Sequence, residues 1–221
     1  MLTDEERDAL LRGADSVQKI AFQGLGKAVG VTAKIHFVDN LQRGVDQIQF
    51  AANAAMSASN NAQSFACQAG CSHCCEVRVE ALVPEILQIV SALKQLPADV
   101  LQTWRTRLQA HVEQVKHLST AEHRVPCVFL QDHLCTIYAI RPAVCRKAHS
   151  FNVSACADHH AEIPQSLQVL LQAEALIKGT AAAYAAHQLD ASGHELSQAI
   201  LTALNDEQIE AHWQQGAAIF V

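Results

Sequence analysis

The eight cysteines of this 221-residue chain lie in one stretch. They are Cys67, Cys71, Cys74, Cys75, Cys127, Cys135, Cys145 and Cys156. Thiols that serve as small core hydrophobes would be scattered along a chain, whereas metal ligands must converge on one point and therefore occur in blocks. The clustering predicts a segment that is organised around a thiol-rich metal centre, with all eight cysteines as candidate ligands.

The first block reads CQAGCSHCC and spaces Cys67, Cys71 and Cys74 as in a tight turn, with Cys75 directly after them. Such spacings let several thiolates face one centre with little loop-closure entropy. Neighbouring side chains usually diverge, so Cys74 and Cys75 are expected to serve two centres or to bridge them. With the second block, the chain has ligands for two four-coordinate sites or for one polynuclear cluster.

Buried structural thiols and a disulfide framework are the alternatives to metal binding. The clustering of the cysteines is evidence against buried structural thiols. The chain is large enough to form a core without disulfide bonds, which is evidence against a disulfide framework. Four thiolates suit both zinc and iron–sulfur clusters. The C-x3-C-x2-C spacing also occurs in radical S-adenosylmethionine enzymes, but the alternating strand and helix pattern of their α/β barrel is missing here. The expected metal is zinc or iron, and an iron–sulfur cluster stays open.

Apolar periodicity outside the cysteine blocks is helical. Thr3 and Glu6 match a capping box ahead of an apolar stripe that ends at the glycines at 24 and 26. Further helices are predicted at 41–64, 83–93, 101–118, 165–189, 193–204 and 206–217, the last with Asn205 as its N-cap. Strand patterns are limited to 77–79 and 128–130. The predicted fold is all-α, a bundle-like helical domain with a loop-rich metal-binding segment.

The segment 120–163 loses periodicity and carries prolines together with four of the cysteines. We expect an N-terminal helical region at 1–66, a cysteine-cluster domain at 67–160 and a C-terminal helical region at 161–221, joined in one compact unit.

The two cysteine blocks resemble those of the YkgJ-type cysteine-cluster proteins, the CxxCxxCC family of zinc- or iron-chelating domains. The matching strings are C-Q-A-G-C-S-H-C-C, P-C-V-F-L and C-T-I-Y-A-I-R-P-A-V-C-R, followed by Cys156. One departure is the three-residue gap between Cys67 and Cys71, where the shortest family form has two. The resemblance implies a bound zinc or iron centre. In flagellin lysine methylase, a similar domain is associated with an iron–sulfur cluster and S-adenosylmethionine.

Basic residues near the cysteines would offset the negative charge of a thiolate centre, although a solvent-facing position is an equal alternative for Arg78 and Lys147. The family string favours a place around the ligands for Arg141 and Arg146, and Tyr138 is expected to pack beside the site. His73 and His149 are further candidate ligands. The remaining histidines with no partner motif are expected on the surface, namely His36, His111, His117, His187, His194 and His212.

A formal net charge of −6 gives no positive field to attract phosphates, so nucleic acid is not an expected partner. No apolar run approaches the length of a membrane span, and the start MLTDEERDALL is acidic where a secretory signal would be basic, so a cytoplasmic location with no membrane partner is expected. No serine-protease, phosphate-loop or dinucleotide motif is present, and any catalysis would rest on the metal. We expect a metal-binding protein. The alternatives are an iron–sulfur enzyme or redox accessory protein, linked to S-adenosylmethionine-dependent methyl transfer, and a zinc-folded interaction scaffold.

Overall fold

The computed structural model describes residues 3–23, 25, 30–58, 64–158 and 162–220. Within these ranges, strands are confined to two short antiparallel pairs and helices form most of the regular structure, which confirms the all-α class. The helices are α1 (Asp4–Phe22), α2 (Val31–His36), α3 (Val38–Ser57), α4 (Val83–Lys94), α5 (Ala98–Val115), α6 (Ala143–Lys147), α7 (Val153–Ala157), α8 (Leu167–Ala186), α9 (Leu196–Asn205) and α10 (Ile209–Gln214), with 3-10 turns η2 (His73–Glu76) and η3 (Tyr138–Ile140).

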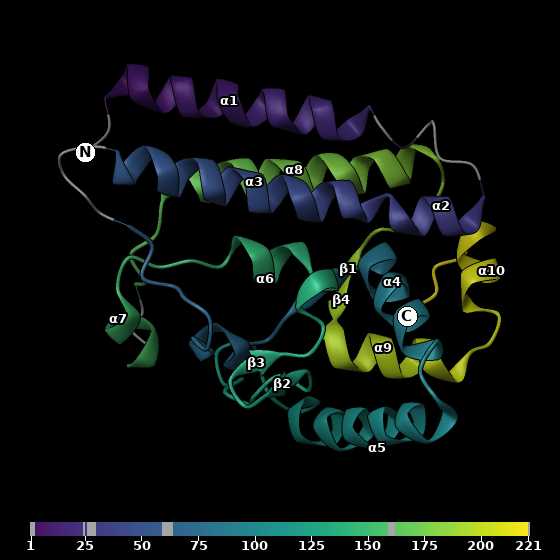
Figure 1. The fold of residues 1–221 in the computed structure, drawn as a ribbon. Coiled ribbons are helices and arrows are strands. Elements are labelled where there is room, and N and C mark those ends of the chain that lie inside the picture. Colours follow the sequence, from purple (N-terminus) through teal and green to yellow (C-terminus); the bar gives the residue numbers. More distant parts are fainter. Residues whose placement is uncertain (1–2, 24, 26–29, 59–63, 159–161, 221) are drawn as a thin grey trace.

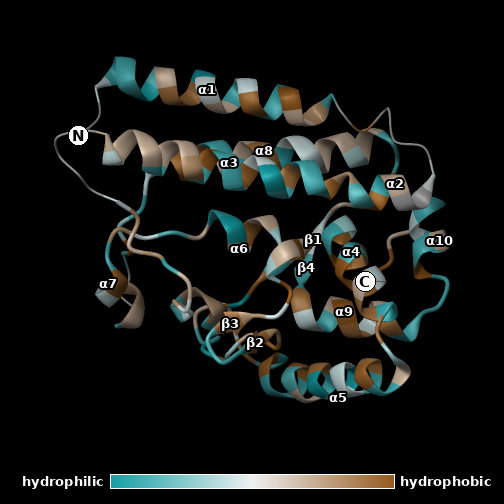
Figure 2. Cartoon of the chain, in the orientation of Figure 1, coloured by the Kyte–Doolittle hydropathy of each residue, from teal (hydrophilic) through white to brown (hydrophobic). Residues whose placement is uncertain are grey.

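The long helices form one side of the molecule. Helix α8 packs against both α1 and α3, and Figure 1 shows α1 running along the α3/α8 pair, with the cysteine-bearing loops on the opposite side of that pair. Hydrophobic and hydrophilic residues alternate along α1 and α5, the pattern of helices with one apolar face (Figure 2). Even so, none of the residues of α1 is buried, so its apolar stripe is only partly covered.

Helix α4 anchors the main core. Every residue from Val83 to Val90 is buried, and α4 packs against α9. The helix can begin here because Pro84 lies in its first turn, where the backbone N–H makes no helical hydrogen bond. It ends at Lys94, ahead of Pro97, because the residue before a proline disfavours helical backbone.

A small sheet joins distant parts of the chain. Strand β1 (Glu80–Leu82) pairs with β4 (Gly193–Glu195), with Ala81 opposite His194. This pairing places the start of α4 beside Ser192, whose carbonyl accepts the Val83 N–H at 3.0 Å, and the start of α9 beside Val79, whose carbonyl accepts the Leu196 N–H at 3.0 Å. The strand predicted at 77–79 is wrong by three residues, because so short a strand carries no alternation that could set its register.

Several predicted helix ends are confirmed and others are corrected. The capping box of α1 is present: the Glu6 N–H donates to Thr3 Oγ1 at 3.2 Å and the Thr3 N–H donates to Glu6 Oε2 at 2.8 Å. Helix α3 begins three residues before the predicted start and ends at Ser57, and the predicted continuation to 64 falls partly on 59–63, outside the described residues. The boundary expected at 160/161 also lies outside them.

Asn205 is not the N-cap of α10. It is the last residue of α9, and its Oδ1 accepts a hydrogen bond from Arg105 Nη1 at 2.6 Å, while α10 begins later, at Ile209. No helix in the described ranges is long and apolar enough to cross a membrane.

Candidate metal centre

The first cysteine block forms a turn followed by a short 3-10 helix. The Cys71 N–H donates to the Gln68 carbonyl at 3.0 Å, and Gly70 takes a φ of 85°, which a residue with a side chain rarely adopts. Cys74 and Cys75 follow within η2. The turn brings Cys67 and Cys71 back toward the helix that carries the other two thiols.

Backbone hydrogen bonds join the first block to the second. The Cys127 N–H donates to the Cys75 carbonyl at 2.7 Å, and the Ala66 N–H donates to the Ser150 carbonyl at 2.8 Å. Helix α7, which carries Cys156, contacts η2. Two segments far apart in the sequence therefore lie side by side at the cysteines.

A hairpin places Cys135 near Cys127. Strands β2 (Leu130–Gln131) and β3 (Leu134–Cys135) pair with Leu130 opposite Cys135, and the Leu130 N–H donates to the Cys127 carbonyl at 2.8 Å. The two turn residues between the strands, Asp132 and His133, have φ values of 49° and 62°, the backbone that a tight two-residue hairpin requires. The strand predicted at 128–130 overlaps β2 only at Leu130.

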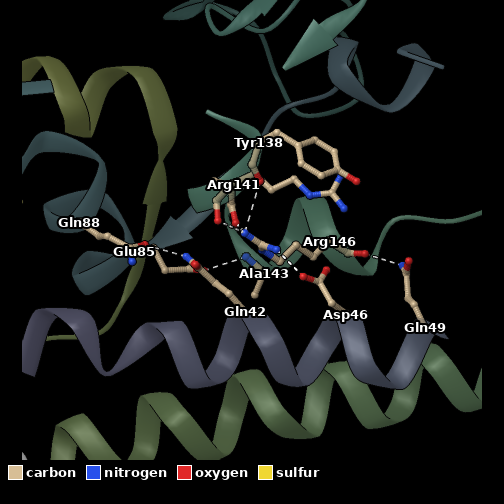
Figure 3. A network of polar contacts seen from close by, with 10 residues as sticks. Gln42, Asp46, Gln49, Glu85, Gln88, Tyr138, Arg141, Ala143 and Arg146 are labelled. Atoms are coloured by element: carbon tan, nitrogen blue, oxygen red, sulfur yellow. Dashed lines mark hydrogen bonds and ion pairs between the residues drawn. The ribbon is translucent and has the colours of Figure 1, made fainter. Parts of the chain in front are cut away.

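Cys145 is held by a buried polar network that links α3, α4 and α6 (Figure 3). The Glu85 carboxylate, 1% exposed, accepts the N–H of Ala143 at 2.7 Å and the N–H of Leu82 at 3.1 Å. Burial raises the pKa of Glu85, and these two backbone hydrogen bonds oppose that rise. The Glu85 carboxylate thus positions the first turn of α6.

Arg146 clamps the loop that precedes α6. Its guanidinium donates to the carbonyls of Arg141 at 2.8 Å and Ala139 at 2.6 Å, and it pairs with Asp46 on α3 at 2.5 Å (Figure 3). The Gln49 side chain donates to the Arg146 carbonyl. Arg146 therefore supports the second cysteine block by binding backbone carbonyls of this loop and a carboxylate of α3.

Each of the thiols discussed below has other thiols as electrostatic neighbours, and we use these neighbours to sort the eight cysteines into two groups. Burial raises the pKa of Cys67, and ionised Cys71, Cys74 and Cys156 raise it further. We call these four the first thiol group. The second thiol group is Cys75, Cys127, Cys135 and Cys145.

Ionised thiols of the second thiol group also raise one another's pKa values. Burial, followed by the repulsion of neighbours that include Cys135, raises the pKa of Cys127 to about 11. Burial again comes first for Cys145, whose pKa is raised further by Cys127, Cys74 and Cys135. Each cysteine block contributes to both groups.

Cys74 and Cys75 stand where the two groups meet. A side-chain hydrogen bond between them raises the pKa of Cys74, with burial adding to the rise, and lowers the pKa of Cys75. Cys74 also raises the pKa of Cys67 in the first group and of Cys127, Cys135 and Cys145 in the second group. That adjacent cysteines serve two centres or bridge them stays a prediction.

The donor set fits a thiolate-bound metal. All eight cysteines are free thiols. Within the described residues, no three His, Cys, Asp or Glu side chains are arranged to hold a metal ion, so the two blocks are adjacent without forming a coordination shell. Grouped thiols that repel one another on ionisation are stabilised by a cation, because the cation replaces their protons.

Arg141 provides a second observation that fits a thiolate-bound metal. Its guanidinium lies over the Tyr138 ring, 4.1 Å from the ring centre. The hydrogen bond with Cys75 raises the pKa of Cys74, burial raises the pKa of Cys135, and the charge of Arg141 opposes both rises. Its Nε is buried and has no hydrogen-bond partner among the described residues. A buried donor without an acceptor is costly, and a thiolate or sulfide centre would provide that acceptor.

The basic residues Arg78 and Lys147 line a pocket of about 360 Å³ together with Cys74 and Cys145. Both cations are also ion-paired, Arg78 with Glu80 at 3.3 Å and Lys147 with Glu174 at 2.7 Å. The pocket therefore lies beside two of the candidate ligands, one from each cysteine block.

Two histidine assignments change. Both ring nitrogens of His149 are engaged, Nδ1 with the Lys147 carbonyl at 2.8 Å and Nε2 with the Ser166 N–H at 2.8 Å, which leaves neither free for a metal. His111 is only 8% exposed, so its predicted surface position is wrong. Its Nδ1 contacts Ser197 Oγ at 2.8 Å, and its ring lies near buried His123. Helical periodicity could have indicated the burial of His111, because His111 lies on the same helix face as Leu108 and Val115.

Comparison with known families identifies the cysteine-bearing part of the chain. Residues 66–168 match the model of the CxxCxxCC family, described as "Putative zinc- or iron-chelating domain". No curated protein and no solved structure matches the chain. The family expected from the motifs is confirmed for residues 66–168, which include all eight cysteines and the α4 and α6 members of the polar network but not its α3 members.

Proposed function

We propose that the CxxCxxCC domain of this chain, residues 66–168, binds zinc or iron through its eight cysteines. The first thiol group would hold one centre and the second thiol group another. The observation that carries this proposal is the hydrogen bond from Cys127 to the Cys75 carbonyl, together with the mutual repulsion of the thiols around it. The hydrogen bond and the repulsion both support the view that ligands from the two distant blocks lie close together.

Metal binding also explains the charge around the cysteines. A four-thiolate site carries a net negative charge even with its metal bound, and burial makes that charge costly. Arg141 lies where its charge stabilises ionised Cys74 and Cys135. Arg146 holds the intervening loop in place through its carbonyls. Free thiols of this number suit a reducing compartment, so we place the protein in the cytoplasm.

An iron–sulfur centre with a small-molecule substrate is the second candidate. The pocket of about 360 Å³ at Cys74 and Cys145 supports it, because a centre with purely structural zinc needs no access for ligands.

The test is anaerobic purification followed by metal analysis, sulfide analysis and a visible absorption spectrum. Zinc without sulfide supports a zinc protein, and iron with inorganic sulfide and brown colour supports the cluster. Rapid labelling of all eight cysteines by a thiol reagent in the metal-replete protein would contradict both.

Single substitutions test the two groups. Cys156→Ser and Cys135→Ser should each reduce the bound metal by about half, because each removes a ligand from one four-coordinate site. Ser154→Ala is the matched control, since Ser154 is exposed on α7 beside Cys156. Complete loss of metal in either cysteine variant would show that the thiols form a single centre.

A further inference from the structure

A large cavity lies away from the cysteines, between α1, α3 and α8. Its volume is about 840 Å³, and it is lined by residues of these helices and of the short segments next to them. Helix α8 packs against both α1 and α3, while α1 follows the opposite side of the α3/α8 pair from the cysteine loops (Figure 1). The cavity therefore belongs to the helical part of the chain and is separate from the proposed metal centre.

Small residues on α3 create the space. Gly44, Ala51, Ala52 and Ala55 lie on the lining face, at the spacing of one helix surface. Their short side chains leave a channel where larger residues would fill the interior. Ile20 of α1 also lines it and is 71% exposed, so the cavity reaches the surface there.

Within the part of the chain that the structure describes, no charged residue lines the cavity. Asp, Glu, Lys, Arg and His are all missing from this lining, although Asp, Glu, Lys and Arg make up 17% of the chain. Its polar members are amides and hydroxyls. Among the described residues, no hydrogen bond engages the side-chain amides of Gln47, Gln168 and Gln172, so these amides are available to a ligand. An ionised ligand would find no counter-charge in the cavity and would lose its hydration.

The size and the lining of the cavity suit a small molecule. Small-molecule sites commonly measure about 300–1,000 Å³, with a mostly apolar lining and a few polar groups. This cavity measures about 840 Å³, and its lining is mostly apolar with a few amides and hydroxyls.

We propose that this cavity is a binding site for an uncharged, mainly apolar small molecule that carries a carbonyl, hydroxyl or amide group. The apolar body of the ligand lies along the alanine face of α3, and its polar group hydrogen-bonds to an amide of Gln168 or Gln172 on α8. Binding of this ligand does not require the metal.

The uncharged dye Nile red, which carries a carbonyl, is a suitable probe for the full-length protein. We expect saturable one-to-one binding with a blue-shifted emission. Ala52→Phe fills the cavity and should weaken binding at least tenfold, whereas Ala54→Phe, on the exposed part of the same helix, should not. Gln172→Leu keeps the volume and should weaken binding about fivefold, the effect of one ordinary hydrogen bond. This variant keeps the test valid if Ala52→Phe does not fold.

The following outcomes would overturn the proposal. One is the absence of saturable Nile red binding, and another is equal binding by wild type and both cavity variants. Equal affinity for the anionic dye 1-anilinonaphthalene-8-sulfonate would refute the preference for an uncharged ligand. A wild-type dimer that Ala52→Phe converts to a monomer would show that a second copy of the chain occupies the groove. Cys156→Ser should leave Nile red binding unchanged, so failure of the metal proposal and of this one are distinguishable.

Discussion

The Glu85 carboxylate accepts the backbone N–H of Ala143 at 2.7 Å, and this single bond connects the most buried helix of the molecule to the first turn of α6. Cys145 lies two residues further along α6. The position of this thiol therefore depends on a carboxylate that hydrogen-bonds to no cysteine among the described residues. Its partners are the backbone N–H groups of Leu82 and Ala143 and the side chain of Gln42.

Glu85→Ala should lower the free energy of unfolding by about 3 kcal/mol, because it leaves two buried N–H groups without acceptors and each costs about 1–3 kcal/mol. Urea unfolding measures this loss. Glu80→Ala, at an exposed carboxylate of the neighbouring strand, is the control and should change stability by less than about 1 kcal/mol. Equal effects in the two variants would mean that Glu85 does not hold α6.

Arg146→Ala should weaken metal retention by about 10- to 100-fold, the usual effect of losing a residue that orients metal ligands. Arg146→Lys should recover only part of this, because an ammonium lacks the planar fork that reaches the Arg141 and Ala139 carbonyls together with Asp46. Competition with a chelator measures both variants.

The matched control for Arg146 is Arg43→Ala. Arg43 is exposed on the same helix as Asp46 and hydrogen-bonds only to Asn40 among the described residues. Arg107 would be a poor control, since it donates to the Val128 carbonyl next to Cys127 at 3.0 Å. If Arg146→Ala keeps metal as well as Arg43→Ala does, the clamp does not support the metal centre.

Removal of the metal should loosen the cysteine-bearing segments before the core. We expect faster amide hydrogen exchange in 66–78 and 123–157, and retained protection in α4, whose residues from Val83 to Val90 are all buried. Exchange with and without chelator tests this. Unchanged protection of both segments in the metal-free protein would show that packing alone orders them.

Protein stability should fall as pH drops below about 6.5, and His111 should contribute to that fall. Burial lowers the pKa of His111, so the unfolded chain binds a proton at this residue more readily than the folded chain does. Its contribution is present above the unfolded pKa and is lost as pH falls through the folded pKa. His111→Gln should flatten the dependence of unfolding free energy on pH between about 7 and 5.

His117→Gln serves as the control for His111, because His117 is exposed just beyond the same helix. It should leave the pH dependence as in the wild type. An identical profile for His111→Gln and the wild type would exclude His111 as a contributor.

Gly179→Ala should destabilise the packing of α1 on α8. A Cβ on Gly179 would overlap the backbone carbonyl of Gln18 and lie 2.9 Å from the Cβ of Ala21. Overpacking of this kind costs about 1–3 kcal/mol, which outweighs a gain in helix propensity of about 1 kcal/mol. Urea unfolding and exchange along α1 measure the loss.

Gly44→Ala gives the contrast. Its Cβ would lie 2.5 Å from Cδ2 of Leu176, the end of a flexible side chain that can turn away. The propensity gain should then leave stability within about 1 kcal/mol of the wild type. If both glycine variants behave alike, a close backbone approach is not what makes Gly179 necessary.

Helices α1, α4 and α5 were predictable because each carries its own apolar period and local end signals, such as the capping box of Thr3 and Glu6 and the proline at 97. The family was predictable because the cysteine spacing and the string around Arg141 are contiguous in the chain. The strands were placed less well. Ala81 pairs with His194, and no local sequence pattern indicates this contact.

The sequence by itself therefore determined the all-α class, the match of residues 66–168 to the CxxCxxCC family and the presence of eight thiols in two blocks. Only the tertiary structure decided which thiols are electrostatic neighbours, that Arg146 acts on backbone carbonyls and Asp46, that His111 is buried, and that a cavity lies between α1, α3 and α8. The physical reason is the range of the interactions. Helix propensity and turn geometry act between residues a few positions apart, whereas charge repulsion, burial and packing depend on which distant segments the folded chain brings into contact.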